Sequence, residues 1–270
     1  MKKILNGLDL AGYIKERQAA DIRRLIQSHN VHPKLAIIKC IDDPVIDTYV
    51  RLKKKYGEDI LAEVDVHKIQ QSKVKPLIEK LNKDESVNGI IIQLPLEDTS
   101  ETDVIVNLVD GNKDVDALGN NAKFDPATPM AILWLLAGYG IGLADKKVLL
   151  IGRGKLVGGP LEKMLKESSV DVSVVDRQTK DLKSLSQHAD VIVTATGNPS
   201  ILFSDMIKPG AVVVDAGVAS EEGKTIGDVA EEVFSRDDIS ITPAKGGVGP
   251  LTVCALFENV IKSTQRSVGS

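Results

Sequence analysis

The sequence predicts an α/β protein with two domains, and three observations carry this prediction. Short apolar runs rich in valine, isoleucine and leucine alternate with amphipathic segments of helical period. The alternation occurs in two series, and residues 117–126 interrupt it with Gly119, Asn120, Asn121 and Pro126. A chain of 270 residues is long enough for two domains of about 100–200 residues each. Alternation of this kind indicates βαβ units and mostly parallel sheets.

The first series begins with an amphipathic helix, in which Leu10, Ile14 and Ile22 recur near helical spacing. Pro44 stands in the first turn of a second helix, where its missing N–H group costs least. A very apolar strand that stops before Pro95 closes the series. In order, the predicted elements are helix 8–28, strand 35–41, helix 43–56, strand 63–66, helix 74–81 and strand 89–93.

The second series follows residues 127–144, a segment without charged side chains. Pro129 and three glycines break this segment, and it is marginal against the ~20 apolar residues that a membrane-spanning helix needs. It therefore predicts a buried helix that ends in a glycine turn. The elements predicted after it are strand 147–151, helix 156–166, strand 170–175, helix 182–187, strands 190–194, 211–215 and 239–242, and helix 251–261.

The composition excludes several classes of protein. With 34 basic and 38 acidic residues, a formal charge of −4 and 3% aromatic residues, the chain lacks the basic surface of a nucleic-acid-binding protein. Two cysteines, and four histidines without metal-ligand spacing, predict neither a disulfide framework nor a metal site. Charged residues interrupt the apolar run that a secretory signal needs. We therefore expect a cytoplasmic protein without a nucleic-acid or membrane partner.

A glycine-rich turn joins the first strand and helix of the second series. Gly152, Gly154 and Gly158 have the spacing G-x-G-x-x-x-G, one residue longer than the common dinucleotide fingerprint. Glycines at such a turn let backbone N–H groups approach a pyrophosphate at the positive end of a helix. The alternative is a tight turn that needs glycine only for packing. We predict a dinucleotide-binding domain.

The next strand of this series ends at Asp176 and Arg177. An acid at this position accepts a hydrogen bond from a ribose 2′-hydroxyl and favours NAD. Arg177, together with Arg153 of the glycine turn, would bind a 2′-phosphate and favour NADP. The residues at this position leave the choice between the two cofactors open.

The first series carries a second set of reactive side chains. Tyr49 and Lys53 are four residues apart, so they share one helix face, and Gln93 ends a very apolar strand. Asp114 and Asp116 lie near the junction of the two series. Each has a structural alternative: a solvated surface pair, a polar residue at a strand end, or acids that brace a linker. A lysine, a glutamine, a tyrosine and a carboxylate near one cleft together indicate an active site.

A second glycine-rich segment precedes the last helix. Residues 246–250 read Gly-Gly-Val-Gly-Pro, which is denser in glycine than a plain turn requires. This density suggests that the backbone approaches a ligand closely, although a crossover between domains would also account for it.

Taken together, these motifs resemble a known family. The matching segments occur in order along nearly the whole chain, and they are similar to the methylenetetrahydrofolate dehydrogenase/methenyltetrahydrofolate cyclohydrolase (FolD-type) family. They are Tyr49–Lys53 (YVRLK), Gly89–Leu96 (GIIIQLPL), Lys113–Asp116 (KDVD), Ala127–Pro129 (ATP), Ile151–Arg153 (IGR) with Val157 and Gly158, and Gly246–Thr252 (GGVGPLT).

The resemblance implies two α/β domains that flank a folate cleft, the second a Rossmann-like doubly wound parallel sheet. It implies that residues 1–120 with 250–270 form the folate-binding catalytic domain and residues 121–249 the dinucleotide-binding domain. The activity it implies is oxidation of 5,10-methylenetetrahydrofolate with NADP, with NAD as the other candidate cofactor, and hydrolysis of the product to 10-formyltetrahydrofolate. One-carbon metabolism, purine biosynthesis and a homodimer belong to the same expectation.

Site residues follow from the resemblance position by position. Lys53 matches the catalytic lysine, Gln93 its hydrogen-bond partner, Tyr49 the tyrosine under the substrate's ring, and Asp116 the acid that binds the pterin. The cofactor-binding residues that it implies are Gly152, Arg153, Gly154, Val157, Gly158, Asp176, Arg177, Thr196 and Val218. The further substrate-binding residues are Leu94, Pro95, Gly246, Gly247 and Pro250. A metal site is not expected.

The chain also departs from the family pattern. The departures are Ile46, Ala117, Gly154, Asp176 with Arg177, and Ala244 with Lys245. They leave two other functions open. One is a monofunctional NAD(P)-dependent dehydrogenase of the same fold, and the other is a folate- or nucleotide-binding protein without catalytic activity. Because binding alone does not need a lysine–glutamine pair, Lys53 and Gln93 favour the enzyme.

Overall fold

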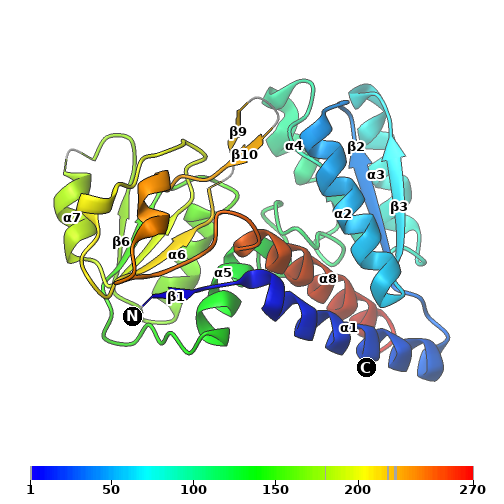
Figure 1. The fold of residues 1–270 in the computed structure, drawn as a ribbon. Coiled ribbons are helices and arrows are strands. Elements are labelled where there is room, and N and C mark those ends of the chain that lie inside the picture. Colours follow the sequence, from blue (N-terminus) through cyan, green and yellow to red (C-terminus); the bar gives the residue numbers. More distant parts are fainter. Residues whose placement is uncertain (1, 180, 218, 222–223, 270) are drawn as a thin grey trace. The chain divides into compact units, whose positions relative to one another are not determined.

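The computed structural model describes residues 2–179, 181–217, 219–221 and 224–269 of the chain (Figure 1). The chain divides into two compact units, each built from two stretches of sequence. Unit 1 is Met1–Ala11 with Thr128–Thr252, and unit 2 is Gly12–Ala127 with Val253–Ser270. Each unit holds a parallel sheet with helices packed on it, so the predicted α/β class is confirmed.

Unit 2 contains a three-stranded parallel sheet in the order β3-β2-β4. Its strands are β2 (Lys34–Lys39), β3 (Glu63–Lys68) and β4 (Gly89–Ile92). The helices of this unit are α1 (Gly7–His29), α2 (Pro44–Ile60), α3 (Val74–Lys83), α4 (Thr102–Val106) and α8 (Val248–Ser267). The first residues of α1 and of α8 belong to unit 1. Two 3-10 turns, η1 (Gln71–Lys73) and η2 (Thr99–Glu101), complete the unit. β4 is fully buried, which explains why its sequence is a continuous apolar run.

One apolar cluster of unit 2 lies between this sheet and α3. Ile38 of β2 and Ile90 and Ile92 of β4 share one buried cluster with Ile78 and Leu81 of α3. Residues two apart on a strand lie on one face of the sheet, and residues three apart on a helix lie on one face of the helix. The apolar side chains on these two faces therefore pack the helix onto the sheet.

Helices α1 and α8 lie side by side in unit 2 (Figure 1). Gln18 of α1 is fully buried, and its Nε2 donates to the carbonyl oxygen of Cys254 at 2.8 Å. Arg17 pairs with Glu258 at 2.7 Å. The last helix is thus held to the first by polar contacts as well as by its apolar face.

Unit 1 contains a six-stranded parallel sheet in the order β1-β11-β8-β7-β5-β6. Counted from β5, the strands β6-β5-β7-β8-β11 run 2-1-3-4-5, which is a doubly wound order whose switch point lies between the first and third strands. The elements are β1 (Lys3–Ile4), α5 (Ala127–Gly138), β5 (Val148–Ile151), α6 (Gly158–Glu167), β6 (Val172–Val175), α7 (Leu182–His188), β7 (Val191–Thr194), η3 (Ser204–Met206), β8 (Val212–Asp215), the hairpin β9 (Ala219–Glu221) and β10 (Lys224–Ile226), η4 (Glu231–Ser235) and β11 (Ser240–Ile241).

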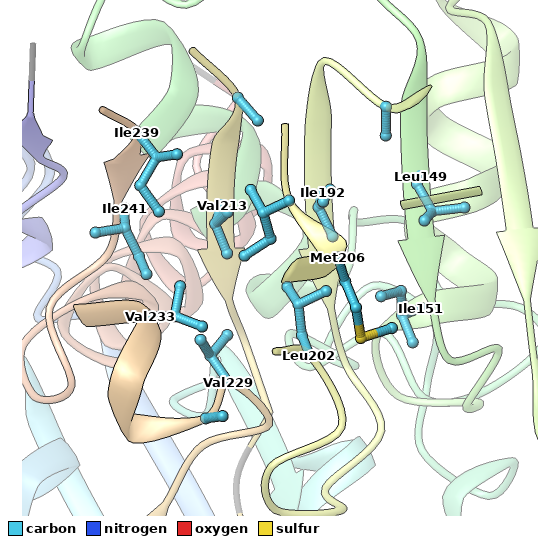
Figure 2. Packing of buried hydrophobic residues seen from close by; sticks show 14 of the residues in the cluster. Leu149, Ile151, Ile192, Leu202, Met206, Val213, Val229, Val233, Ile239 and Ile241 are labelled. Atoms are coloured by element: carbon cyan, nitrogen blue, oxygen red, sulfur yellow. The ribbon is translucent and has the colours of Figure 1, made fainter. Parts of the chain in front are cut away.

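One face of this sheet carries the apolar cluster in Figure 2. Leu149 and Ile151 of β5, Ile192 of β7 and Val213 of β8 point into it, in the two-residue alternation of strands. The segments that follow β7 and precede β11 cover the cluster with Leu202, Met206, Val229, Val233 and Ile239. The apolar cluster therefore packs on the middle of the sheet, and the segments after the strands extend beyond it.

The structure differs from the predicted element pattern mainly at short elements. β1 was not predicted; it pairs with β11, Lys3 opposite Ser240, and it places the first eleven residues in unit 1 rather than with residues 12–120. The short helix α4 and the hairpin β9–β10 were also not predicted. Predicted strands 170–175 and 239–242 are shorter in the structure, and the last helix is longer than the predicted 251–261.

Candidate functional site

Helix α2 positions two of the predicted site residues. Its N-terminus is closed by Asp43, whose Oδ1 accepts hydrogen bonds from the backbone N–H groups of Val45 and Ile46 at 2.8 and 3.0 Å. The helix then runs to Ile60 without a break, so Tyr49 and Lys53 lie one turn apart on the same face. Both side chains are half-buried rather than exposed, which contradicts the alternative of a solvated surface pair.

Lys53 is hydrogen-bonded to the predicted glutamine. Its Nζ donates to Oε1 of Gln93 at 2.9 Å. Gln93 directly follows β4, and its backbone N–H donates to the carbonyl oxygen of Ile38 at 2.8 Å, which continues the ladder of the sheet. The glutamine is therefore held by the sheet and the lysine by the helix, so their contact joins two rigid elements.

The pKa values of Lys53 and Asp116 depend on burial and on the charge of the other residue. Burial lowers the pKa of Lys53, and the nearby Asp116 carboxylate raises it in part. Burial raises the pKa of Asp116, and Lys53 lowers it in part. Burial also raises the pKa of the Tyr49 hydroxyl. Tyr49, Lys53, Gln93 and Asp116, which we call the lysine site, all belong to unit 2.

Hydrogen bonds hold the segment that contains Asp116, both before and after this residue. Nζ of Lys113 donates to the carbonyl oxygens of Leu81, Asn82 and Asp84 at 3.0, 2.9 and 2.7 Å, which closes the C-terminus of α3. The carboxylate of Asp114 accepts from the backbone N–H of Gly119 at 2.7 Å. Asp114 is therefore an acid that braces the loop, as the structural alternative predicted, whereas the charge of Asp116 acts on Lys53.

Asp114 is 4% exposed, and burial raises its pKa to about 6 in spite of the hydrogen bonds that it accepts. Its turn places Ala117 at φ +56°, in the left-handed region that favours glycine. Asn259 of α8 completes the support, because its Nδ2 donates to the carbonyl oxygens of Val115 and Asp125 at 2.9 Å each. Asn259 could not be predicted as a support of this loop, since a single asparagine in an apolar helix has many possible partners.

A pocket of about 390 Å³ opens at the carboxyl ends of the sheet in unit 1. We call it the switch-point pocket, because it lies at the ends of β5, β6 and β7, where the strand order reverses. Its lining residues are Ile151, Gly152, Arg153, Gly154, Val175, Asp176, Arg177, Thr179, Leu182, Ala195, Thr196, Asn198 and Ile201.

The pocket includes six of the residues predicted to bind the cofactor: Gly152, Arg153, Gly154, Asp176, Arg177 and Thr196. Val157 and Gly158 do not line it and lie at the start of α6. Val218 lies outside the described residues. The other seven lining residues were not predicted to bind the cofactor: Ile151, Val175, Thr179, Leu182, Ala195, Asn198 and Ile201. The end of the apolar strand before Ala195 was a usable signal.

The three glycines of the turn have different roles. Gly152 has φ +104°, and a Cβ atom there would lie 2.6 Å from the carbonyl oxygen of Ala195. A Cβ atom on Gly158 would lie 2.0 Å from the carbonyl oxygen of Gly152. A Cβ atom on Gly154 would meet nothing within 4 Å, so this residue borders open space. Gly152 and Gly158 thus permit the close turn, and the space above Gly154 is free for a ligand.

Two acids, the half-buried Asp215 and the buried Asp228, brace the wall of this pocket, and sequence reasoning missed both. Asp215 ends β8 and accepts from the backbone N–H groups of Asp228 and Val229 at 3.1 Å each. Asp228 accepts from the backbone N–H of Thr196 at 2.7 Å, and its carbonyl oxygen accepts from that of Ile201 at 2.8 Å. Both ends of the segment 196–201 are therefore tied to one residue.

The glycines before the last helix meet protein backbone in the structure. Leu8 donates its backbone N–H to the carbonyl oxygen of Gly246 at 3.0 Å, and a Cβ atom on Gly7 would lie 1.8 Å from the carbonyl oxygen of Gly247. The start of α1 therefore packs on this segment, which accounts for part of its glycine content. The substrate roles of Gly246, Gly247 and Pro250, and of Leu94 and Pro95 after Gln93, stay predictions.

Two negative findings concern only the part of the chain that the structure describes. Within it, no three histidine, cysteine, aspartate or glutamate side chains gather as a metal-binding group. Among the same residues, no helix is both long and apolar enough to cross a membrane.

A doubly wound sheet with a pocket at its switch point, and a second α/β unit with a half-buried lysine beside a glutamine and an acid, define a dinucleotide-dependent enzyme of the Rossmann type. The comparisons specify the family. Residues 5–116 match the tetrahydrofolate dehydrogenase/cyclohydrolase catalytic domain, and residues 126–268 match the tetrahydrofolate dehydrogenase/cyclohydrolase NAD(P)-binding domain. The chain belongs to the tetrahydrofolate dehydrogenase/cyclohydrolase family, as the sequence motifs predicted.

Individual relatives agree with this assignment over their whole length. The chain is 36% identical to the bifunctional protein FolD of Lactobacillus acidophilus, covering 100% of this chain and 99% of that protein. The crystal structure of FolD from Campylobacter jejuni superposes with a TM-score of 0.92 at 37% identity, over 98% of this chain and 99% of that one. A Trypanosoma brucei FolD, solved in complex with NADP cofactor and an inhibitor, has a TM-score of 0.92 at 28% identity, over 99% and 98%.

Proposed function

We propose that the protein oxidises 5,10-methylenetetrahydrofolate to 5,10-methenyltetrahydrofolate with NADP and then hydrolyses the product to 10-formyltetrahydrofolate. The observation that carries the proposal is the hydrogen bond of Lys53 to Gln93 beside the charge of Asp116. Membership of a family whose two domain models match 5–116 and 126–268 supports both activities.

Asp116 and Tyr49 are the proposed substrate-binding residues of the lysine site. The amidine-like edge of a pterin presents two N–H donors, and a carboxylate can accept both at once. Asp116 is held by a fixed loop and is half-buried, so its position is defined before substrate binds. Tyr49, on the same helix face as Lys53, offers an aromatic ring on which the substrate can stack.

The switch-point pocket fits the proposed cofactor. The free space above Gly154 and the close turn at Gly152 and Gly158 suit a pyrophosphate at the start of α6. Arg153 and Arg177 are the cations that would meet a 2′-phosphate, and Asp176 is the acceptor for a ribose hydroxyl. When bound, NADP supplies the acceptor for the hydride that leaves the methylene carbon.

Lys53 is the proposed proton-transfer group. Hydrolysis of the methenyl product adds water to the one-carbon bridge, breaks one of its two C–N bonds and releases one proton overall. An amine at Lys53 can accept a proton from the attacking water, and burial favours the amine by lowering the pKa of Lys53. The hydrogen bond to Gln93 fixes the direction of the Nζ atom, because it holds one N–H in either protonation state.

The cell-level proposals are a cytoplasmic homodimer that supplies one-carbon units, including those for purine biosynthesis. Two observations support the cytoplasm: neither of the two buried cysteines forms a disulfide, and the composition lacks the cysteine content of a disulfide framework. The homodimer rests on the family resemblance alone, and a sedimentation measurement of the purified chain tests it.

The function is tested by stopped-flow absorbance with 5,10-methylenetetrahydrofolate and either NADP or NAD. The proposal expects reduction of NADP, followed by methenyl product that decays faster than in the absence of the enzyme. Methenyl product that accumulates and decays at the spontaneous rate would instead indicate a monofunctional dehydrogenase. Absence of reduction with both cofactors would indicate a binding protein.

A further inference from the structure

Arg153, a cation of the switch-point pocket, is paired with a carboxylate from helix α6. Its Nε donates to Oε2 of Glu162 at 2.8 Å, and its Nη2 donates to Oε1 at 3.1 Å. The two bonds form a bidentate pair, which is the strongest geometry for a guanidinium and a carboxylate. Glu162 is 6% exposed, whereas the side chain of Arg153 is 61% exposed toward the pocket side.

The pairing with Glu162 reduces the number of N–H groups with which Arg153 can bind an anion. One of the two-nitrogen edges of the guanidinium is already occupied by Glu162. A phosphate must use the remaining N–H groups or displace the carboxylate, and it then lies close to a negative charge. Because Glu162 is buried, water screens that charge poorly.

The carboxylate is fixed by more than Arg153. Nζ of Lys166, one turn further along α6, donates to Oε1 of Glu162 at 2.6 Å. These contacts hold the pKa of Glu162 below its usual range, with the lysine as the larger cause, so the side chain is charged at neutral pH. Glu162 is thus a permanent negative charge behind the pocket.

The lining of the pocket carries a second negative charge. Asp176, at the end of β6, also lines the pocket, and one of its oxygens accepts from the backbone N–H of Gln178 at 2.9 Å. Its other oxygen can accept a hydrogen bond from a ribose 2′-hydroxyl. Both carboxylates act against a 2′-phosphate, and Asp176 favours the hydroxyl that NAD carries in its place.

We propose that Glu162 is a specificity-determining residue that weakens the preference of this enzyme for NADP over NAD by engaging Arg153. The inference rests on the proposed function, because it assumes that the switch-point pocket binds the adenosine end of the cofactor. It adds a residue outside the pocket lining, which sets cofactor choice through the arginine that it holds.

Equilibrium binding of NADP, NAD and 2′,5′-ADP to the purified protein tests this inference without turnover. In Glu162→Gln, the affinities for NADP and 2′,5′-ADP should rise by roughly 3- to 10-fold, as for removal of one charge at a partly exposed pair, and that for NAD should stay unchanged. The matched control is Glu167→Gln, because Glu167 lies on the same helix but pairs with Lys163. This control should leave all three affinities unchanged.

Two double variants test whether the effect of Glu162 on NADP affinity depends on Arg153 or on Lys166. The gain in NADP affinity should vanish when Arg153→Ala accompanies Glu162→Gln, and it should persist when Lys166→Ala does. An NADP-to-NAD affinity ratio that stays constant or falls in Glu162→Gln would overturn the inference while leaving the proposed function intact. Absence of binding of both dinucleotides to the unmodified protein would overturn the inference and the proposed function together.

Discussion

Lys53 and Gln93 are hydrogen-bonded at 2.9 Å although they lie on different elements, the lysine in the middle of α2 and the glutamine directly after β4. The bond brings the end of a buried strand and one face of a helix to the same place. Burial lowers the pKa of this lysine and Asp116 raises it in part, while the uncharged amide of Gln93 adds no compensating charge. The chemistry of the site therefore depends on Gln93 being neutral.

Gln93→Glu should raise the pKa of Lys53, because a carboxylate at hydrogen-bond distance stabilises the ammonium form. The pH above which the amine is available for cyclohydrolase activity then moves upward. We expect the rising limb of kcat/KM against pH to shift to higher pH by about one unit or more. Gln93→Ala provides the comparison, since it removes the hydrogen bond without adding charge. A profile of Gln93→Glu that coincides with that of the unmodified protein would contradict this coupling.

Asp114→Asn should change how stability depends on pH. The folded pKa of Asp114 is about 6, above the ordinary value of 3.8, so between these values the folded state binds more protons than the unfolded state. Below pH ~4 the raised pKa of Asp114 makes its full contribution to the free energy of unfolding. This contribution, roughly 2–3 kcal/mol in total, is lost as pH rises through 6. Chemical unfolding of both proteins from pH 4 to pH 8 measures this. The stability difference, variant minus unmodified, should increase with pH; a constant difference would contradict the titration of Asp114.

Gly158→Ala and Gly154→Ala should differ sharply although they alter the same turn. At Gly158 the added Cβ atom would lie 2.0 Å from a carbonyl oxygen, so the backbone must shift, and we expect a loss of about 2 kcal/mol or more. At Gly154 nothing lies within 4 Å, and we expect a change within about ±1 kcal/mol. Thermal unfolding of the two variants decides this. Equal losses would mean that the turn is not packed as described.

Ala117→Gly should stabilise the protein, because Ala117 has φ +56° and glycine adopts this conformation without a steric cost. The expected gain in unfolding free energy is about 1 kcal/mol. Ala137→Gly, in helix α5, is the control of opposite sign and should destabilise by about 1 kcal/mol. A loss of stability in Ala117→Gly would show that the turn after Asp116 is not strained.

The parts of the fold that could be predicted from the sequence are those with local apolar patterns. The runs at 89–93 and 147–151 specify buried strands, because parallel strands covered on both faces need apolar residues at every position. β1 could not be predicted, since it has two residues, Lys3 and Ile4, and exists only by pairing with β11, more than two hundred residues away. Such long-range pairing leaves no periodic signal.

The same distinction holds for the candidate sites. Tyr49 and Lys53 were predicted because helical spacing places them on one face, and Gln93 because it ends an apolar strand. The pairing of Arg153 with Glu162 and the bracing by Asp228 depend on where a loop returns, which spacing does not specify. The glycines at 246 and 247 show that a dense glycine pattern also arises where two backbone segments of the protein meet, and their predicted substrate roles stay untested.

Lys53 is the proposed proton-transfer group at the one-carbon bridge, and Lys53→Ala removes its amine. The control is Lys54→Ala, because Lys54 is the next residue of α2 and is exposed. Hydrolysis of 5,10-methenyltetrahydrofolate, followed by its absorbance, should be slower by about 10²–10⁴-fold in Lys53→Ala and unchanged in Lys54→Ala, with both variants folded. A hydrolysis rate in Lys53→Ala equal to that of the unmodified protein would contradict the account.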